Sequence, residues 1–61
     1  MDVDPAVGMR VKLARTLSKG LKKGMEGLIT NYHAQSDLCE VEFDFGATAD
    51  VDGDDLVRIP S

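Results

Sequence analysis

The stretch LCEVEFD, residues 38–44, decides the fold class of this 61-residue chain. Its apolar side chains, Cys39, Val41 and Phe43, alternate with the acidic side chains of residues 40, 42 and 44. A period of two residues is typical of a β-strand that buries one face and exposes the other. The sequence therefore predicts a strand here, with the Cys-Val-Phe face turned toward a core.

Four further short strands are predicted on either side of this stretch. In GMRVKLAR, residues 8–15, Met9, Val11 and Leu13 alternate with polar or small residues, and GLITNYH, GATADV and LVRIP supply the others. Glycines separate most of these segments, and a long polar connection, TLSKGLKKG, follows the first of them. Five short strands about ten residues apart predict an all-β chain, folded as a five-stranded antiparallel barrel that closes its own edges.

A helix is the alternative for residues 9–21. Leu13, Leu17 and Leu21 lie four residues apart, which is the spacing of an amphipathic helix, and Gly20 would suit its C-terminal end. Val11 would fall outside that apolar stripe, so the strand interpretation accounts for more of the segment.

Composition and length restrict the class of protein. With 43% hydrophobic and 30% charged residues the chain is globular, and 61 residues make one domain of marginal stability. The single cysteine, Cys39, cannot form an internal disulfide, and no apolar run approaches the length of a membrane span. The acidic start, MDVDPAVGMR, is unlike a signal peptide. We expect a cytoplasmic protein without a membrane partner, present as a monomer or a weak homodimer.

The stretches GMRVKLARTLSKGLKKGMEGLI, CEVEFDFG and DDLVRI resemble the SH3-like barrel superfamily. The matching features are a first strand after a glycine, a long first loop, the Gly24-Met25-Glu26-Gly27 step, and a third strand that ends in Phe43-Asp44. The resemblance covers residues 7–60, leaves residues 1–6 as an N-terminal tail, and implies a 3₁₀ turn before the last strand with Leu56 covering a barrel end.

The resemblance implies three different functions. Stand-alone bacterial SH3-like proteins of uncharacterised function share most of these features, and imply an accessory module. The SH3-like insertion of RecD-type helicases and relaxases shares the start of the first strand and the third strand, and implies contact with single-stranded DNA. Type II dihydrofolate reductases share the size and the barrel. However, this chain has Ala49-Asp50-Val51-Asp52 near the place of their Val-Gln-Ile-Tyr segment, so the enzyme is the least favoured of the three.

Charge is distributed unevenly along the chain. Residues 10–23 contain bases and no acid, residues 37–55 contain acids and no base, and the formal net charge is −4. Basic loops contact phosphates without reading sequence, so nucleic-acid binding is one alternative. Its residues would be Arg10, Lys12, Arg15, Lys19, Lys22 and Lys23.

We favour a protein partner, because the net negative charge opposes binding to nucleic acid. The predicted partner-binding surface combines the first loop with two aromatic residues, namely Leu17, Lys19, Leu21, Lys22, Lys23, Met25, Tyr32 and Phe45. The alternative for the three apolar loop residues is that they fold back over a barrel end.

Catalytic, metal and cofactor sites are not predicted. His33 and Cys39 could form a nucleophilic pair, but Cys39 alternates in phase with the apolar residues and is expected in the core. His33, Asp37 and Cys39 lack the ligand spacing of a zinc site. The sequence therefore predicts a protein that is not an enzyme.

The aspartate-rich stretch DVDGDD, residues 50–55, resembles a calcium loop at three alternating positions, Asp50, Asp52 and Asp54. Position 6 of that motif requires glycine and position 12 an acid, and the chain has Asp55 and Ser61 there. Asp and Gly are favoured by turn geometry alone, so a turn before the last strand is predicted instead.

Overall fold

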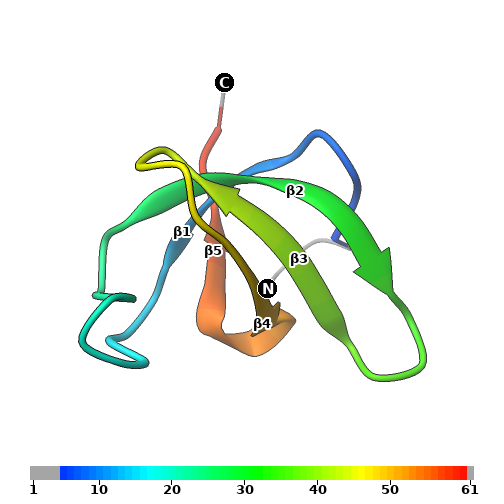
Figure 1. Ribbon diagram of the computed structural model, residues 1–61. Helices are drawn as coiled ribbons and strands as arrows, with labels where there is room; N and C mark the ends of the chain where they lie inside the picture. The colour runs from blue at the N-terminus through cyan, green and yellow to red at the C-terminus, as the bar shows by residue number, and fades with distance from the viewer. Residues whose placement is uncertain (1–4, 61) are drawn as a thin grey trace.

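The computed structural model of the chain describes residues 5–60 and consists of a single antiparallel β-sheet (Figure 1). Its elements are β1 (Arg10–Leu13), β2 (Glu26–His33), β3 (Leu38–Phe43), β4 (Thr48–Asp52), the 3₁₀ turn η1 (Gly53–Asp55) and β5 (Leu56–Arg58). The all-β class, the five strands and the 3₁₀ turn before the last strand are confirmed. The helix alternative for residues 9–21 is wrong, because β1 occupies residues 10–13 and residues 14–21 form a loop without a helix.

The strand order is β4-β3-β2-β1-β5, so the first and last strands of the chain are neighbours. Among residues 5–60, no pairing between β4 and β5 closes the sheet. β2 is the longest strand and curves across the whole sheet (Figure 1). Of the predicted N-terminal tail, residues 1–4 lie outside the described residues. Residues 5–60 include no helix with the length and apolar composition that a membrane crossing requires.

The core consists of apolar side chains that the strands turn to the same side of the sheet. Cys39, Val41 and Phe43 are all buried, as the alternation in LCEVEFD predicts. The other strands contribute in the same way, and the remaining buried apolar residues are Val11, Leu13, Ile29, Val51 and Leu56. Ala47 belongs to the segment GATADV, which is predicted as a strand, but it precedes β4 and is exposed.

Gly27 brings β2 and β3 into close contact. A Cβ atom at this position would lie 2.7 Å from the Glu42 carbonyl oxygen and 2.7 Å from Cγ1 of Val41. Glycine is therefore required by the packing of the two strands, because both neighbours belong to a strand that cannot move away without disturbing the core.

A β-bulge interrupts β2 between Ile29 and Asn31. Ile29 is paired with Val41, whereas Asn31 is already paired with Glu40, so Thr30 is the extra residue. One extra residue reverses the faces on which the following side chains lie. Tyr32 is consequently opposite the buried Cys39 and packs against the core.

Candidate functional site

The connection between β1 and β2, residues 14–25, carries three exposed lysines and is called the lysine loop below. Its two ends meet at Leu13, whose N–H donates to the Met25 carbonyl at 2.9 Å and whose carbonyl accepts from the Gly24 N–H at 2.9 Å. A small hairpin forms within the loop, where Leu17 N–H donates to the Leu21 carbonyl and Ser18 and Leu21 form a β-bridge. The loop thus has a defined backbone conformation.

Side-chain acceptors stabilise the second half of the lysine loop. The Lys23 N–H donates to Oγ1 of Thr16 at 3.0 Å, and the Lys22 N–H lies 3.4 Å from the Met25 sulfur. Both lysines are therefore held by their backbones, while their side chains are exposed.

The apolar residues of the lysine loop face inward. Leu17, Leu21 and Met25 are half-buried and pack against the core. They were predicted as partner-binding residues, and the structure places them in the position of the alternative, folded back over one end of the sheet. Lys19, Lys22 and Lys23 are exposed around them.

Two of the predicted nucleic-acid-binding residues are engaged by acids of the same chain. Arg10 donates to both carboxylate oxygens of Asp44, at 2.9 and 3.1 Å, and to Oε1 of Glu26 at 3.2 Å. Arg15 donates to both oxygens of Asp55, at 2.7 and 3.3 Å. The predicted basic set therefore separates into paired arginines and the lysines.

These ion pairs change the acidity of their members. The hydrogen bonds that Arg10 donates to Asp44 lower the pKa of the Asp44 carboxyl group and raise the pKa of the Arg10 guanidinium. The hydrogen bonds that Arg15 donates to Asp55 likewise raise the pKa of Arg15. Lys12 lies opposite Glu26 in the pairing of β1 with β2.

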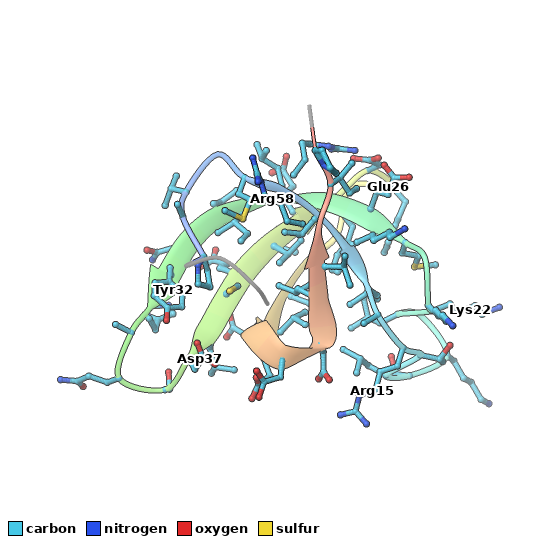
Figure 2. All side chains as sticks on the ribbon, turned by 180° about the vertical axis from the view of Figure 1, so that it is seen from behind. Arg15, Lys22, Glu26, Tyr32, Asp37 and Arg58 are labelled. Atoms are coloured by element: carbon cyan, nitrogen blue, oxygen red, sulfur yellow. The ribbon has the colours of Figure 1, made fainter. Side chains whose placement is uncertain are left out.

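The two aromatic residues of the predicted surface are placed differently. Tyr32 lies away from the lysine loop, and Phe45 stacks on another ring. Glu26 follows the loop and Tyr32 is six residues further along β2, about 20 Å for an extended strand. Figure 2 shows Tyr32 and Lys22 on opposite sides of the molecule. Phe45 is 56% exposed and stacks on Phe43 with ring centroids 5.7 Å apart. The structure therefore does not bring Tyr32 together with the lysines.

His33 and Cys39 lie on opposite faces of the sheet. Cys39 is fully buried on the core face, and burial raises the pKa of its thiol. His33 is paired with Leu38, one residue before Cys39, and is exposed. Because adjacent residues of a strand point to opposite faces, the imidazole cannot activate the thiol.

The aspartate-rich stretch forms a turn with an acidic surface. Asp52 Oδ1 accepts a hydrogen bond from the Asp54 N–H at 2.9 Å and caps η1. Carboxylate oxygens of Asp37, Asp52 and Asp54 lie within 4.8 Å of one another. This group omits Asp50 and includes Asp37 from the turn between β2 and β3. It is therefore not the calcium-loop arrangement considered from the sequence.

Comparisons with known proteins give no relative for this chain. No protein-family model matches it, and neither the curated proteins nor the solved structures yielded a match.

Proposed function

We propose that this chain is a non-catalytic adaptor module, folded as an SH3-like barrel, that binds an acidic segment of a protein partner through the lysine loop. The barrel is supported by the placement of β5 beside β1, by the η1 turn between β4 and β5, and by the burial of Leu56 after that turn. The free thiol of Cys39 agrees with a cytoplasmic location, where cysteines stay reduced. The module acts as a monomer or a weak homodimer.

The observation that carries this proposal is that the three exposed lysines of the lysine loop have no carboxylate partner among the described residues, unlike the two arginines of the same basic stretch. Arg10 and Arg15 each form an ion pair within the chain, whereas Lys19, Lys22 and Lys23 form none with another residue of the described part. The chain contains 11 acids and 7 lysines and arginines, so acids are in excess. Even so, these three lysines remain exposed to solvent. A surface of this kind attracts a negatively charged partner.

The defined conformation of the lysine loop favours binding further. Leu17 and Leu21 anchor it to the core, and the two hydrogen bonds at Leu13 fix its ends. A loop that is already ordered loses less conformational entropy when a partner binds.

A nucleic-acid partner is the second candidate, since the same lysines could contact phosphates. Single-strand binders normally add exposed aromatic side chains for base stacking. Here Phe43 is buried and Tyr32 packs against the core. Only Phe45 is an exposed aromatic residue among those that the structure describes. Protein is therefore favoured over nucleic acid.

A two-probe binding assay tests the proposed function. The probes are a fluorescein-labelled peptide of alternating Glu and Leu and a labelled 12-nucleotide oligo(dT), each titrated at low and high salt. The triple variant Lys19→Gln/Lys22→Gln/Lys23→Gln is compared with the wild-type chain and with Lys12→Gln, which removes a lysine outside the loop.

We expect the peptide to bind the wild-type chain and Lys12→Gln, and to lose at least tenfold in affinity with the triple variant. Because the contact is ionic, affinity should also fall as salt rises. Binding of oligo(dT) without binding of the peptide would replace the adaptor proposal by the nucleic-acid one.

A further inference from the structure

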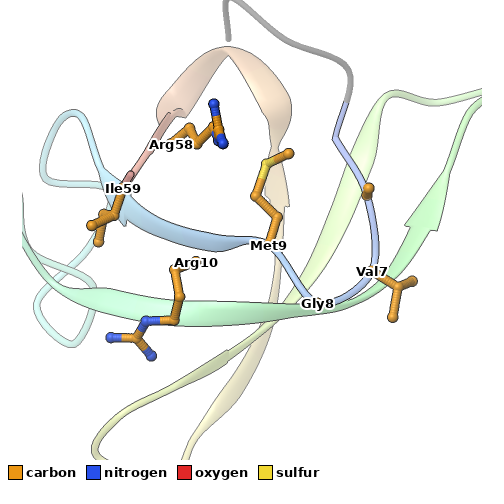
Figure 3. Close-up of a pocket in the computed structure, with 7 residues that line it drawn as sticks. Val7, Gly8, Met9, Arg10, Arg58 and Ile59 are labelled. Carbon is orange, nitrogen blue, oxygen red and sulfur yellow. The ribbon is translucent and has the colours of Figure 1, made fainter. Parts of the chain in front are cut away.

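A second surface, unrelated to the lysine loop, is a groove of about 320 Å³ between residues 6–9 and the end of β5 (Figure 3). Apolar side chains form much of its wall, including Val7, Met9 and Ile59. The backbone of residues 6–9 is a turn in which the Met9 N–H donates to the Ala6 carbonyl at 3.1 Å and Gly8 has a φ of 93°. This turn is fixed to the sheet by the Gly8 N–H, which donates to the Ile29 carbonyl at 2.8 Å.

Two arginines, Arg10 and Arg58, line this groove. Figure 3 shows the Arg58 guanidinium extending toward Met9, while Arg10 projects from the other side of β1. Arg10 and Arg15 each bind a carboxylate of the chain, but Arg58 forms no ion pair with another residue between 5 and 60. In a chain with an excess of acids, an arginine without a carboxylate beside apolar walls fits a carboxylate supplied from outside.

The backbone of Arg58 is also oriented toward the free edge of the sheet. The Ile59 N–H donates to the Arg10 carbonyl, and the Ala14 N–H donates to the Asp55 carbonyl. Hydrogen-bonded pairs alternate along an antiparallel ladder, so Arg58, which is opposite Val11, directs its N–H and carbonyl away from β1. An extended chain that pairs with β5 at this point would use these groups.

We propose that this groove binds the C-terminal end of a partner polypeptide, with its free carboxylate on Arg58 and an apolar last side chain against Met9. The binding free energy that the contacts can supply favours a peptide over a small organic acid. An exposed ion pair contributes little binding free energy in water, so it would hold a small acid poorly. A peptide adds hydrogen bonds along the edge of β5 and apolar contact with the groove.

The test uses a labelled hexapeptide, Gly-Ser-Gly-Ser-Val-Ile, as the free acid and as the C-terminal amide. We expect the free acid to bind the full chain at least fivefold more tightly than the amide, and to shift the amide signals of Gly8, Met9, Arg58 and Ile59. Arg58→Gln should abolish the difference between acid and amide, whereas Arg15→Gln, which alters an arginine elsewhere, should retain it. Unchanged dispersion of the remaining signals shows that both variants are folded.

Equal affinities for acid and amide would overturn the proposal, and so would binding of N-acetylisoleucine as tight as that of the hexapeptide. Shifts confined to residues 14–25 would assign the carboxylate to the lysine loop instead. The lysine-loop proposal is tested with separate variants, so the two proposals can fail independently.

Discussion

The Tyr32 hydroxyl donates a hydrogen bond to Oδ1 of Asp37 at 3.0 Å, across the turn that joins β2 to β3. Asp37 has a φ of 55°, and its carbonyl accepts from the Gly53 N–H at 3.0 Å. This one aspartate therefore connects the end of β2, the following turn and η1.

Removing the Tyr32 hydroxyl should loosen this connection without disturbing the ring. We expect Tyr32→Phe to lower the free energy of unfolding by about 1 kcal/mol, the usual net contribution of one hydrogen bond. Urea denaturation measures the change. A value indistinguishable from wild type would show that the hydrogen bond adds nothing to stability.

The backbone of Asp37 should limit which residues are accepted there. Asn tolerates the left-handed conformation and retains an acceptor, whereas a β-branched residue does not. We expect Asp37→Asn to change stability little and Asp37→Val to cost about 1–2 kcal/mol from backbone strain, in addition to the lost hydrogen bond. Similar stabilities for the two variants would contradict this account.

Gly27 should be the least replaceable glycine of the described part. A methyl group there would lie 2.7 Å from the Glu42 carbonyl oxygen, so Gly27→Ala is expected to cost about 1–3 kcal/mol or more. Gly20→Ala is the matched control, because a Cβ atom at Gly20 has no neighbour within 4 Å. Thermal unfolding of the two variants should differ clearly, and equal effects would show that β2 and β3 can separate.

The Arg10–Asp44 ion pair should make stability depend on pH in the acid range. Arg10 lowers the pKa of Asp44 in the folded chain, so the pair stabilises the fold above the ordinary aspartate pKa of about 3.9. This contribution is lost as pH falls below that value and Asp44 becomes protonated. Both groups are exposed, so the effect is small and weakens with salt.

Urea midpoints measured from pH 7 to pH 2 test this dependence. Asp44→Asn should have a lower midpoint than wild type at pH 7 and the same midpoint at the acid end. Asp50→Asn is the control variant, because it removes an exposed carboxylate that has no ion pair with another residue of the described part. A difference for Asp44→Asn that persists at pH 2 would mean that the ion pair is not its cause.

Cys39 should resist alkylation in the native protein. It is fully buried, and burial raises the pKa of the thiol, so little thiolate is accessible. We expect iodoacetamide to react at least about a hundredfold more slowly with the folded chain than with the chain in urea. Rapid labelling under native conditions would place Cys39 at the surface and overturn the description of the core.

The strand pattern was predictable because it depends on local alternation. Cys39, Val41 and Phe43 are buried as LCEVEFD predicts, and Leu56 is buried after the predicted turn. The three residues of β3 follow the two-residue period without interruption, so no distant information was needed.

The position of Tyr32 could not be predicted from the sequence because of one inserted residue. Strict alternation from the buried Ile29 would turn Asn31 inward and Tyr32 outward, but the bulge at Thr30 reverses both. Nothing in the sequence marks this bulge. Similarly, Arg10 and Asp44 are 34 residues apart, so their pairing depends on the strand order and could not be recognised from the run of bases.

The meeting of both ends of the lysine loop at Leu13 has a consequence for engineering. Because Leu13 bonds both Gly24 and Met25, the loop leaves and re-enters the sheet at one point. Its length can therefore change without altering the register of β1 and β2, and each doubling of such a closed segment costs only about 0.6 kcal/mol. The attachment of the lysine loop at Leu13 makes this small sheet a scaffold into which foreign recognition sequences can be grafted.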